Sequence, residues 1–204
     1  MRDSLLMAFI TTLPWRQRNI RELKVMPFAD GGNLYKEEIP AHCRMARSPW
    51  VEEALRANPR ERFWQFHFRS HETKTGCVVR AILPRQLVPP LEEYIARHRG
   101  VLLGEHRDPG TLFFSRRGHP FSRGAILRMV GDLTMKYGKV RVNPHLIRDI
   151  FAVKWLQDHP EDYVTVMKIL WHRNIQTTLR FYGAGFDESH AAVRVEEWQD
   201  RRKR

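Results

Sequence analysis

The chain has 204 residues, 42% of them hydrophobic and 28% charged, which is ordinary for a folded protein with a core of its own. Its 35 lysines and arginines against 23 acidic residues give a net charge of +12, which is typical of a protein that binds a polyanion such as nucleic acid; a surface kept soluble by charge is the simpler alternative. Two cysteines, Cys43 and Cys77, exclude a disulfide framework and a cysteine metal site, and no apolar run reaches the roughly 20 residues of a membrane span.

The first quarter of the chain predicts short helices. Two helices are expected at residues 4–13 and 16–25, and a loop-rich segment is expected over 26–47. Ser48 followed by proline is a typical helix start, which predicts a helix that stops near Pro59.

A β-hairpin is expected next. The stretch FWQFHFRS alternates aromatic residues at 64, 66 and 68 with polar ones, which is typical of a half-buried strand. A turn at Thr75-Gly76 leads into a second strand over 78–83.

The rest of the chain reads mostly as helix. One helix closes at Gly100, and a short extended piece, TLFFS, follows it. Another helix is capped by Ser122 and ends at Gly138, and nearly all residues from Pro144 are helical. The predicted fold class is therefore α+β, mostly α-helical with a small antiparallel sheet.

The motif NPHLIRDIF carries a pair of residues suited to phosphate chemistry. His145 and Arg148 are three apart on a predicted helix, so both can touch one phosphate from the same face. Cleaving a phosphodiester without a metal requires arginines on the oxygens, a proton donor and a nucleophile such as tyrosine. By itself, such a pair is more often simply part of the surface of an amphipathic helix.

The order of motifs around this pair resembles the catalytic domain of the tyrosine recombinases, the phage integrase family. The stretches WRQRNIREL, ETKTG, NPHLIRDIF and LWHRNIQTTLRFYG are similar to the four boxes of that family. The residues that the resemblance marks as catalytic are Arg16, Lys74, His145, Arg148, His172 and Tyr182.

Three departures from the family pattern stand near these residues. The first box usually has a glycine and a glutamate, where Pro14 and Asn19 stand nearby instead, and Arg18 beside it leaves open which arginine belongs to this box. Asp149 stands where the family often has histidine, and Trp171 replaces the glycine before the last histidine.

The resemblance implies a site-specific recombinase or integrase that cleaves and rejoins DNA through a 3′-phosphotyrosyl intermediate. Tyr182 is then the nucleophile, Lys74 the general acid, and His145 a general base or a residue that tunes the tyrosine. No metal and no cofactor are implied, because the covalent link preserves the energy of the phosphodiester.

The remaining family roles concern the phosphate oxygens. The resemblance implies that Arg16 and Arg148 hold them, with His172 or Trp171 assisting.

Two other activities stay open: type IB topoisomerase-like nicking and closing, and a DNA-binding remnant without chemistry.

The resemblance also implies a domain organisation and partners. Residues 1–204 are expected to form the catalytic domain, without the core-binding domain that usually precedes it. A tail helix at about 187–201 is expected to dock on a neighbouring copy in a tetramer on double-stranded DNA, or to pack on its own domain. The expected location is the cytoplasm, associated with the nucleoid, for a bacterial or phage-encoded protein.

Overall fold

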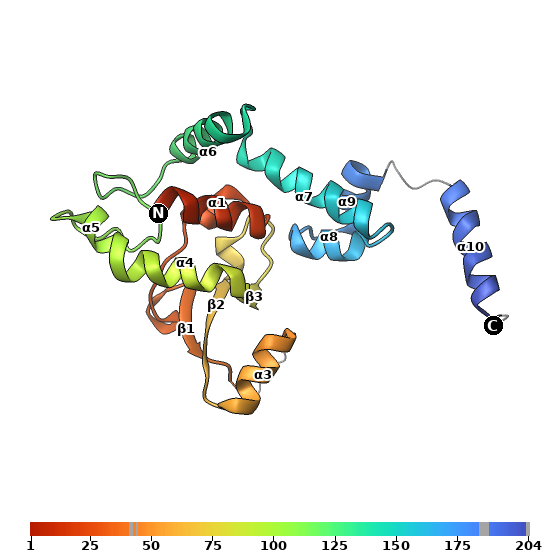
Figure 1. Ribbon diagram of the computed structural model, residues 1–204, viewed down its shortest axis with the longest axis horizontal. Helices are drawn as coiled ribbons and strands as arrows, with labels where there is room; N and C mark the ends of the chain where they lie inside the picture. Colours follow the sequence, from red (N-terminus) through yellow and green to blue (C-terminus); the bar gives the residue numbers. More distant parts are fainter. Residues whose placement is uncertain (41–42, 44, 184–187, 203–204) are drawn as a thin grey trace. The chain divides into compact units, whose positions relative to one another are not determined.

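The computed structural model describes residues 1–40, 43, 45–183 and 188–202, and Figure 1 traces its elements in chain order. The chain divides into two compact units, Met1–Ile147 and Arg148–Arg204, and each has a fold of its own. In the part of the chain that the structure describes, no helix has both the length and the apolar character that a membrane crossing requires.

The strands of the first unit form one antiparallel sheet with the order β1-β2-β3. Their bounds are Leu34–Glu38 for β1, Arg62–Phe68 for β2 and Val79–Ile82 for β3. The hairpin of β2 and β3 confirms the two predicted strands. The prediction of a loop over 26–47 is wrong where β1 lies, because this strand is mostly polar and has no apolar alternation. Pairing with the other edge of β2, where Leu34 faces Phe66, is what makes it a strand.

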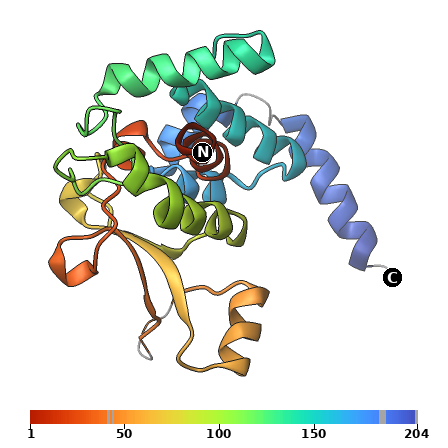
Figure 2. The ribbon, with the colours of Figure 1, turned by 60° about the vertical axis from the view of Figure 1, so that its left-hand side comes forward.

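Both ribbon views show α1 of the first unit beside the α4 segment (Figures 1 and 2). α1 contacts the turns on either side of α4, η3 and η4. The α-helices are α1 (Arg2–Thr12), α2 (Gln17–Arg21), α3 (Pro49–Ala57), α4 (Val88–Glu93), α5 (Gly100–Leu103) and α6 (Arg123–Gly138). The other helical segments are the 3₁₀ turns η1 (Phe28–Asp30), η2 (Ser70–Glu72) and η3 (Arg85–Leu87) and the π-helical η4 (Tyr94–Arg99).

Two predicted helix ends are wrong. The helix expected over 16–25 ends at Arg21, because Lys24 and Val25 instead pair as β-bridges with distant segments. The helix expected to close at Gly100 continues to Leu103, since Gly100 itself is helical. The chain leaves the helix at Gly104, where φ is +54° and glycine avoids the strain that a side chain would add.

Two capping predictions have different outcomes. The hydroxyl of Ser122 accepts a hydrogen bond from the backbone N–H of Ala125 at 3.1 Å, and α6 ends at Gly138 as predicted. Ser48 also precedes a helix, α3, but its side chain makes no capping hydrogen bond. The proline that follows it and the acidic first turn remain favourable for a helix start there.

Aromatic packing attaches the α1–α2 corner to the sheet. Trp15, 5% exposed, lies edge-on to Phe66 and Phe68 of β2, with ring centroids 4.4 and 5.2 Å away. Phe9 of α1 packs against Trp15 at 6.5 Å and against Phe113 at 5.8 Å. Since edge-to-face aromatic pairs favour defined geometries, this cluster determines where the residue after Trp15 lies.

The second unit is built of helices. They are α7 (Pro144–Asp158, whose first turn belongs to the first unit), α8 (Tyr163–Ile169), α9 (Ile175–Tyr182) and α10 (Glu188–Arg202). Its core joins α7, α8 and α9 through buried Ala152, Val166 and Leu170, with Trp155, Leu156 and Tyr182 packed against them. α10 occupies the segment of the expected tail helix, of which residue 187 lies outside the described residues.

Asn33 ties three segments of the first unit together and is only 1% exposed. Its Oδ1 accepts a hydrogen bond from the N–H of Lys24 at 2.7 Å. Its Nδ2 donates to the carbonyl of Glu22 at 3.0 Å and to a carboxylate oxygen of Glu72 at 2.9 Å. One side chain therefore links the end of α2, the start of β1 and η2.

We expect Asn33→Ala to lower the free energy of unfolding by about 2–4 kcal/mol, because it removes three hydrogen bonds and leaves buried groups unpaired. Urea denaturation followed by circular dichroism measures the loss. Asn58→Ala is the matched control, since Asn58 is exposed and bonds Glu61 at the surface, and it is expected to cost less than about 1 kcal/mol. Equal losses in the two variants would contradict this role for Asn33.

Candidate active site

Arg16 stands at the N-cap of α2, directly after the anchored Trp15. Its Nη1 is buried and has no hydrogen-bond partner among the described residues. Burial lowers the pKa of Arg16, and the electrostatic interaction with Cys77 raises it by a smaller amount. A buried guanidinium nitrogen without a hydrogen-bond acceptor is costly, so this arrangement favours the binding of an anion.

The neighbouring arginines are engaged elsewhere. Arg18 pairs with Glu22 at 3.0 Å, and Arg21 pairs with the same carboxylate at 2.9 Å. Arg18 is also exposed, whereas Arg16 is partly buried. The geometry thus favours Arg16 as the arginine of the first box.

Lys74 lies in the turn between η2 and β3, and this loop is attached to α2. The amide of Asn19 on α2 donates to the carbonyl of Glu72 at 3.0 Å. Within the loop, the hydroxyl of Thr73 donates to the carbonyl of Cys77 at 2.8 Å. Lys74 itself is exposed. The first unit therefore brings the Lys74 loop and the Arg16 helix together, with the ammonium group open to a ligand.

His145 and Arg148 follow each other by one turn on α7. Asn143 starts this helix: its Oδ1 accepts from the N–H groups of His145 and Leu146, both at 2.9 Å. The side chain of His145 is exposed. Arg148 is 3% exposed, and its Nη2 donates to the carbonyl of Leu170 at the end of α8.

The segment that follows α8 carries His172. Its Nδ1 lies 3.0 Å from the hydroxyl of Thr178, a fully buried residue of α9. Trp171, just before it, has a φ of +53°, a left-handed conformation that costs a residue with a side chain about 1–3 kcal/mol. This backbone explains why glycine suits the position and shows that a buried tryptophan can also occupy it.

Tyr182 is the last residue of α9, and its hydroxyl donates to Oδ1 of Asp149 on α7 at 2.6 Å. Burial is the main cause that raises the pKa of Tyr182 above its ordinary value. The hydrogen bond and the negative charge of Asp149 raise this pKa further, and Arg148 lowers it. The tyrosine is therefore held neutral beside a carboxylate.

The candidate residues thus form two groups, one in each compact unit. Arg16 and the Lys74 loop lie together in the first. The second holds Arg148, His172 and Tyr182, from three neighbouring segments of the helical core. His145 stands on the turn of α7 that precedes Arg148. Within the described residues there is no cluster of histidine, cysteine and carboxylate side chains that could hold a metal ion.

Asp149 belongs to this arrangement, but the sequence does not reveal its role. The sequence shows it only as a departure from the family pattern, without a role. Its contact with Tyr182 joins residues 33 positions apart, so no local spacing indicates it.

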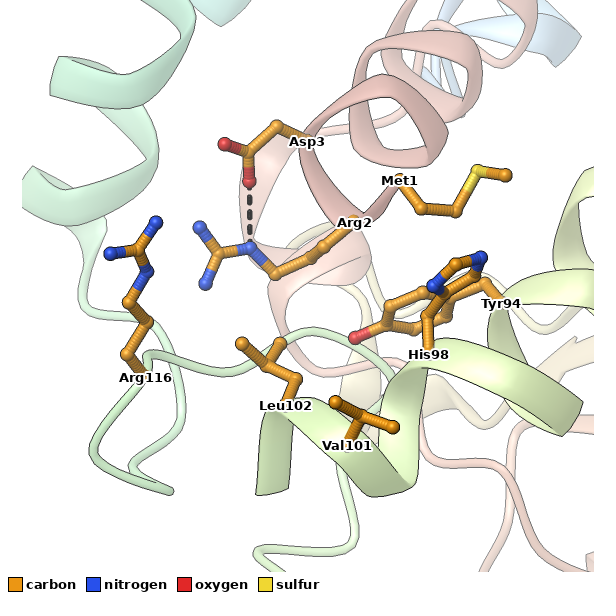
Figure 3. A pocket seen from close by; sticks show the side chains of 8 residues that line it. All are labelled: Met1, Arg2, Asp3, Tyr94, His98, Val101, Leu102 and Arg116. Carbon is orange, nitrogen blue, oxygen red and sulfur yellow. Dashed lines mark hydrogen bonds and ion pairs between the residues drawn. The ribbon is translucent and has the colours of Figure 1, made fainter. Parts of the chain in front are cut away.

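The first unit also holds a cavity of about 480 Å³ (Figure 3). Arg2 at its edge forms an ion pair with Asp3 at 2.7 Å, so one of its cations is already neutralised. None of the six expected catalytic residues lines it. The lining residues are Met1, Arg2, Asp3, Tyr94, His98, Val101, Leu102 and Arg116.

The mostly helical fold with a small sheet matches the catalytic domains of tyrosine recombinases. Residues 58–188 match the model of the phage integrase family, and the chain belongs to that family. Tyrosine recombinase XerC of Lactobacillus delbrueckii subsp. bulgaricus is 33% identical over 89 residues, which are 43% of this chain and 30% of the relative. A corresponding protein of Lactobacillus leichmannii is 32% identical over the same shares.

Solved structures share the fold across nearly the whole chain. The XerH site-specific recombinase bound to difH substrate has a TM-score of 0.62 and 16% identity, covering 97% of this chain and 47% of that one. The XerA recombinase has a TM-score of 0.57 and 21% identity, covering 98% and 58%. The Tn1549 transposon integrase with transposon right end DNA has a TM-score of 0.58 and 17% identity, covering 97% and 58%. The chain thus spans about half the length of these proteins.

We expect Tyr182 to ionise above its ordinary pKa of 10.0, because burial and Asp149 both disfavour the phenolate. The folded chain then holds this proton more tightly than the unfolded chain. The stability that it contributes is present below about pH 10 and is lost as the pH rises further. The difference in tyrosinate absorbance between the wild type and Tyr182→Phe isolates this titration, and ionisation at or below pH 10.0 would contradict the arrangement.

Proposed function

We propose that this chain is the catalytic part of a site-specific recombinase that cleaves and rejoins DNA through a tyrosine nucleophile. The observation that carries the proposal is the second unit, where a buried arginine, a histidine and a tyrosine come from neighbouring segments of one helical core. Membership of the phage integrase family supports it, and the matched region contains five of the six residues.

The proposed chemistry needs no metal or cofactor. The hydroxyl oxygen of Tyr182 attacks the scissile phosphorus, the bond from phosphorus to the 5′-oxygen breaks, and a 3′-phosphotyrosyl link remains. Lys74 gives a proton to the departing 5′-oxygen. Attack by a 5′-hydroxyl on the phosphotyrosine then restores a phosphodiester and returns the tyrosine.

Cationic groups stabilise the charge that develops on the phosphate oxygens. Arg16 and Arg148 hold these oxygens, because a guanidinium presents two parallel donors that match a phosphate. His172, whose Nδ1 lies 3.0 Å from the hydroxyl of Thr178, assists at the same group. His145, one turn before Arg148, contributes a further contact. Preorganised donors of this kind account for several kcal/mol of catalysis.

Double-stranded DNA is the proposed partner. The net charge of +12 supports binding to a polyanion. The XerH and Tn1549 structures with the same fold are complexes with DNA. A recombinase of this kind acts on DNA in the cytoplasm, at the nucleoid of a bacterium.

Self-association through α10 is part of the same proposal. Val193, Val195 and Trp198 of this helix are each slightly more than half exposed. Apolar side chains that a helix leaves in water favour docking against another surface. We propose that α10 docks on a neighbouring copy in a tetramer on DNA. If removing residues after 187 leaves the oligomeric state on DNA unchanged, the helix packs on its own domain instead.

We expect Tyr182→Phe to abolish the covalent complex with a suicide DNA substrate, read on a denaturing gel, because phenylalanine has no nucleophilic oxygen. A mobility-shift assay is expected to show unchanged DNA binding. Tyr137→Phe is the matched control, since Tyr137 of α6 is 74% exposed, and it should cleave like the wild type. A covalent complex that persists in the Tyr182 variant would refute the assignment.

We expect Arg148→Lys to slow cleavage by at least about 10²-fold, because a point charge lacks the two-donor fork that clamps a phosphate. Single-turnover cleavage measures the rate, and thermal melting checks that the variant folds. The exposed Arg56→Lys on α3 serves as control and should retain full activity.

Comparison of supercoil relaxation with two-site strand exchange separates a topoisomerase from a recombinase, since only the recombinase joins two sites.

A further inference from the structure

The hydrogen bond between Tyr182 and Asp149 is not used by the proposed chemistry, although it involves the reacting oxygen. The distance of 2.6 Å from the phenol oxygen to Oδ1 is in the range of short, charge-assisted O–H···O⁻ bonds. Asp149 directly follows Arg148 on α7, and Tyr182 is the last residue of α9. The carboxylate therefore lies next to both the nucleophile and a proposed phosphate ligand.

One side of this pair faces an apolar core. Tyr182 packs against the core of Ala152, Val166 and Leu170, so α8 contributes aliphatic groups on that side. Among the described residues, the charged groups that act on the phenol are Asp149 and Arg148, both from α7. The bond itself is partly buried, so water competes less for the phenol proton there than at the surface, and the carboxylate is placed to accept it.

Other proton acceptors are placed differently. His145 lies one turn before Asp149 on α7, but its side chain is exposed. His172 directs its Nδ1 to the hydroxyl of Thr178. In the described part of the chain, the bond that the structure gives to the phenol hydroxyl goes to Asp149.

We propose that Asp149 is the general base that accepts the phenolic proton of Tyr182 during strand cleavage. This inference rests on the proposed function and gives His145 the role of a phosphate ligand instead of a base. As the tyrosine oxygen bonds to phosphorus, its proton moves to Oδ1 of Asp149 while the 5′-oxygen leaves with a proton from Lys74. In rejoining, the 5′-hydroxyl attacks phosphorus and gives its proton to the neutral amine of Lys74, the phosphotyrosyl bond breaks, and Asp149 returns its proton to the phenol oxygen.

The same contact also accounts for the resting state. Before DNA binds, the carboxylate keeps the phenol protonated and raises the pKa of Tyr182. When a phosphorus atom accepts the oxygen lone pair, the phenol becomes a stronger acid, and the proton can pass along the existing hydrogen bond. No rearrangement of α7 or α9 is required for this transfer.

The test is single-turnover cleavage of a suicide DNA substrate by Asp149→Asn. Asparagine keeps an oxygen that can accept the hydrogen bond, but this oxygen cannot take up a proton near neutral pH. We expect cleavage about 10²–10⁴-fold slower than the wild type at neutral pH, with DNA binding unchanged. The rate of this variant is expected to rise with hydroxide concentration, because the phenol must then ionise by itself.

Asp158→Asn is the matched control, since Asp158 is an exposed carboxylate at the end of the same helix. It loses the same charge and should cleave like the wild type. If Asp149→Asn cleaves as fast as the wild type, Asp149 is not the base. Faster cleavage would also overturn the proposal, because the carboxylate would then only restrain the tyrosine.

Asp149→His is a second variant that replaces one base by another. We expect it to recover part of the activity lost in Asp149→Asn, with a rate that rises through about pH 6.5, where imidazole loses its proton. If the histidine variant has the same rate and pH profile as the asparagine variant, the proposal is contradicted. This comparison holds even where the asparagine variant folds poorly, because it depends on the pH profile of the histidine variant.

Failure of this inference is distinguishable from failure of the proposed function. If the wild type forms no covalent complex with DNA, both are overturned. If the wild type cleaves and Tyr182→Phe does not, while Asp149→Asn cleaves like the wild type, the recombinase function stands and only the role of Asp149 is wrong.

Discussion

The guanidinium of Arg148 is almost completely removed from water, and the arrangement of the second unit depends on how this charge is accommodated. A buried cation is tolerated only where hydrogen bonds replace its hydration. The carbonyl of Leu170 provides one such bond and thereby joins α7 to the end of α8. The next two residues after that carbonyl are Trp171 and His172, so the same contact positions the backbone that presents the histidine.

The hydrogen bond from Tyr182 to Asp149 completes this arrangement from the other side. It joins α9 back to α7, one residue from Arg148, and Tyr182 also packs on the apolar core of Ala152, Val166 and Leu170. The cation and the phenol are therefore held on α7, and the imidazole contacts Thr178 of α9. Chemistry at a phosphate benefits from this, because groups that are already oriented do not have to be ordered during the reaction.

In the first unit, too, packing and hydrogen bonds orient the cationic residues before a ligand binds. Trp15 is packed between α1 and the sheet, and Arg16 follows it with a buried nitrogen that has no partner in the described residues. The loop of Lys74 is attached to α2 through Asn19. The cost of desolvating the guanidinium is offset in part when an anion binds, so a stable fold with such a residue favours a phosphate ligand. Arg18 and Arg21 differ from Arg16, because both pair with the carboxylate of Glu22.

Sequence alone determined the elements whose signals are local. Ser122 and Gly138 mark the ends of α6, aromatic alternation marks β2, and the order of the boxes identifies the family.

Other features were decided by contacts between distant residues. β1 is a strand because β2 offers it an edge, Lys24 leaves the helix to pair with Thr111, and Asp149 meets Tyr182 only when α7 and α9 pack. Local spacing encodes helix caps and strand faces, whereas the choice among nearby arginines and the partner of the tyrosine depend on burial and charge, which exist only in the folded chain.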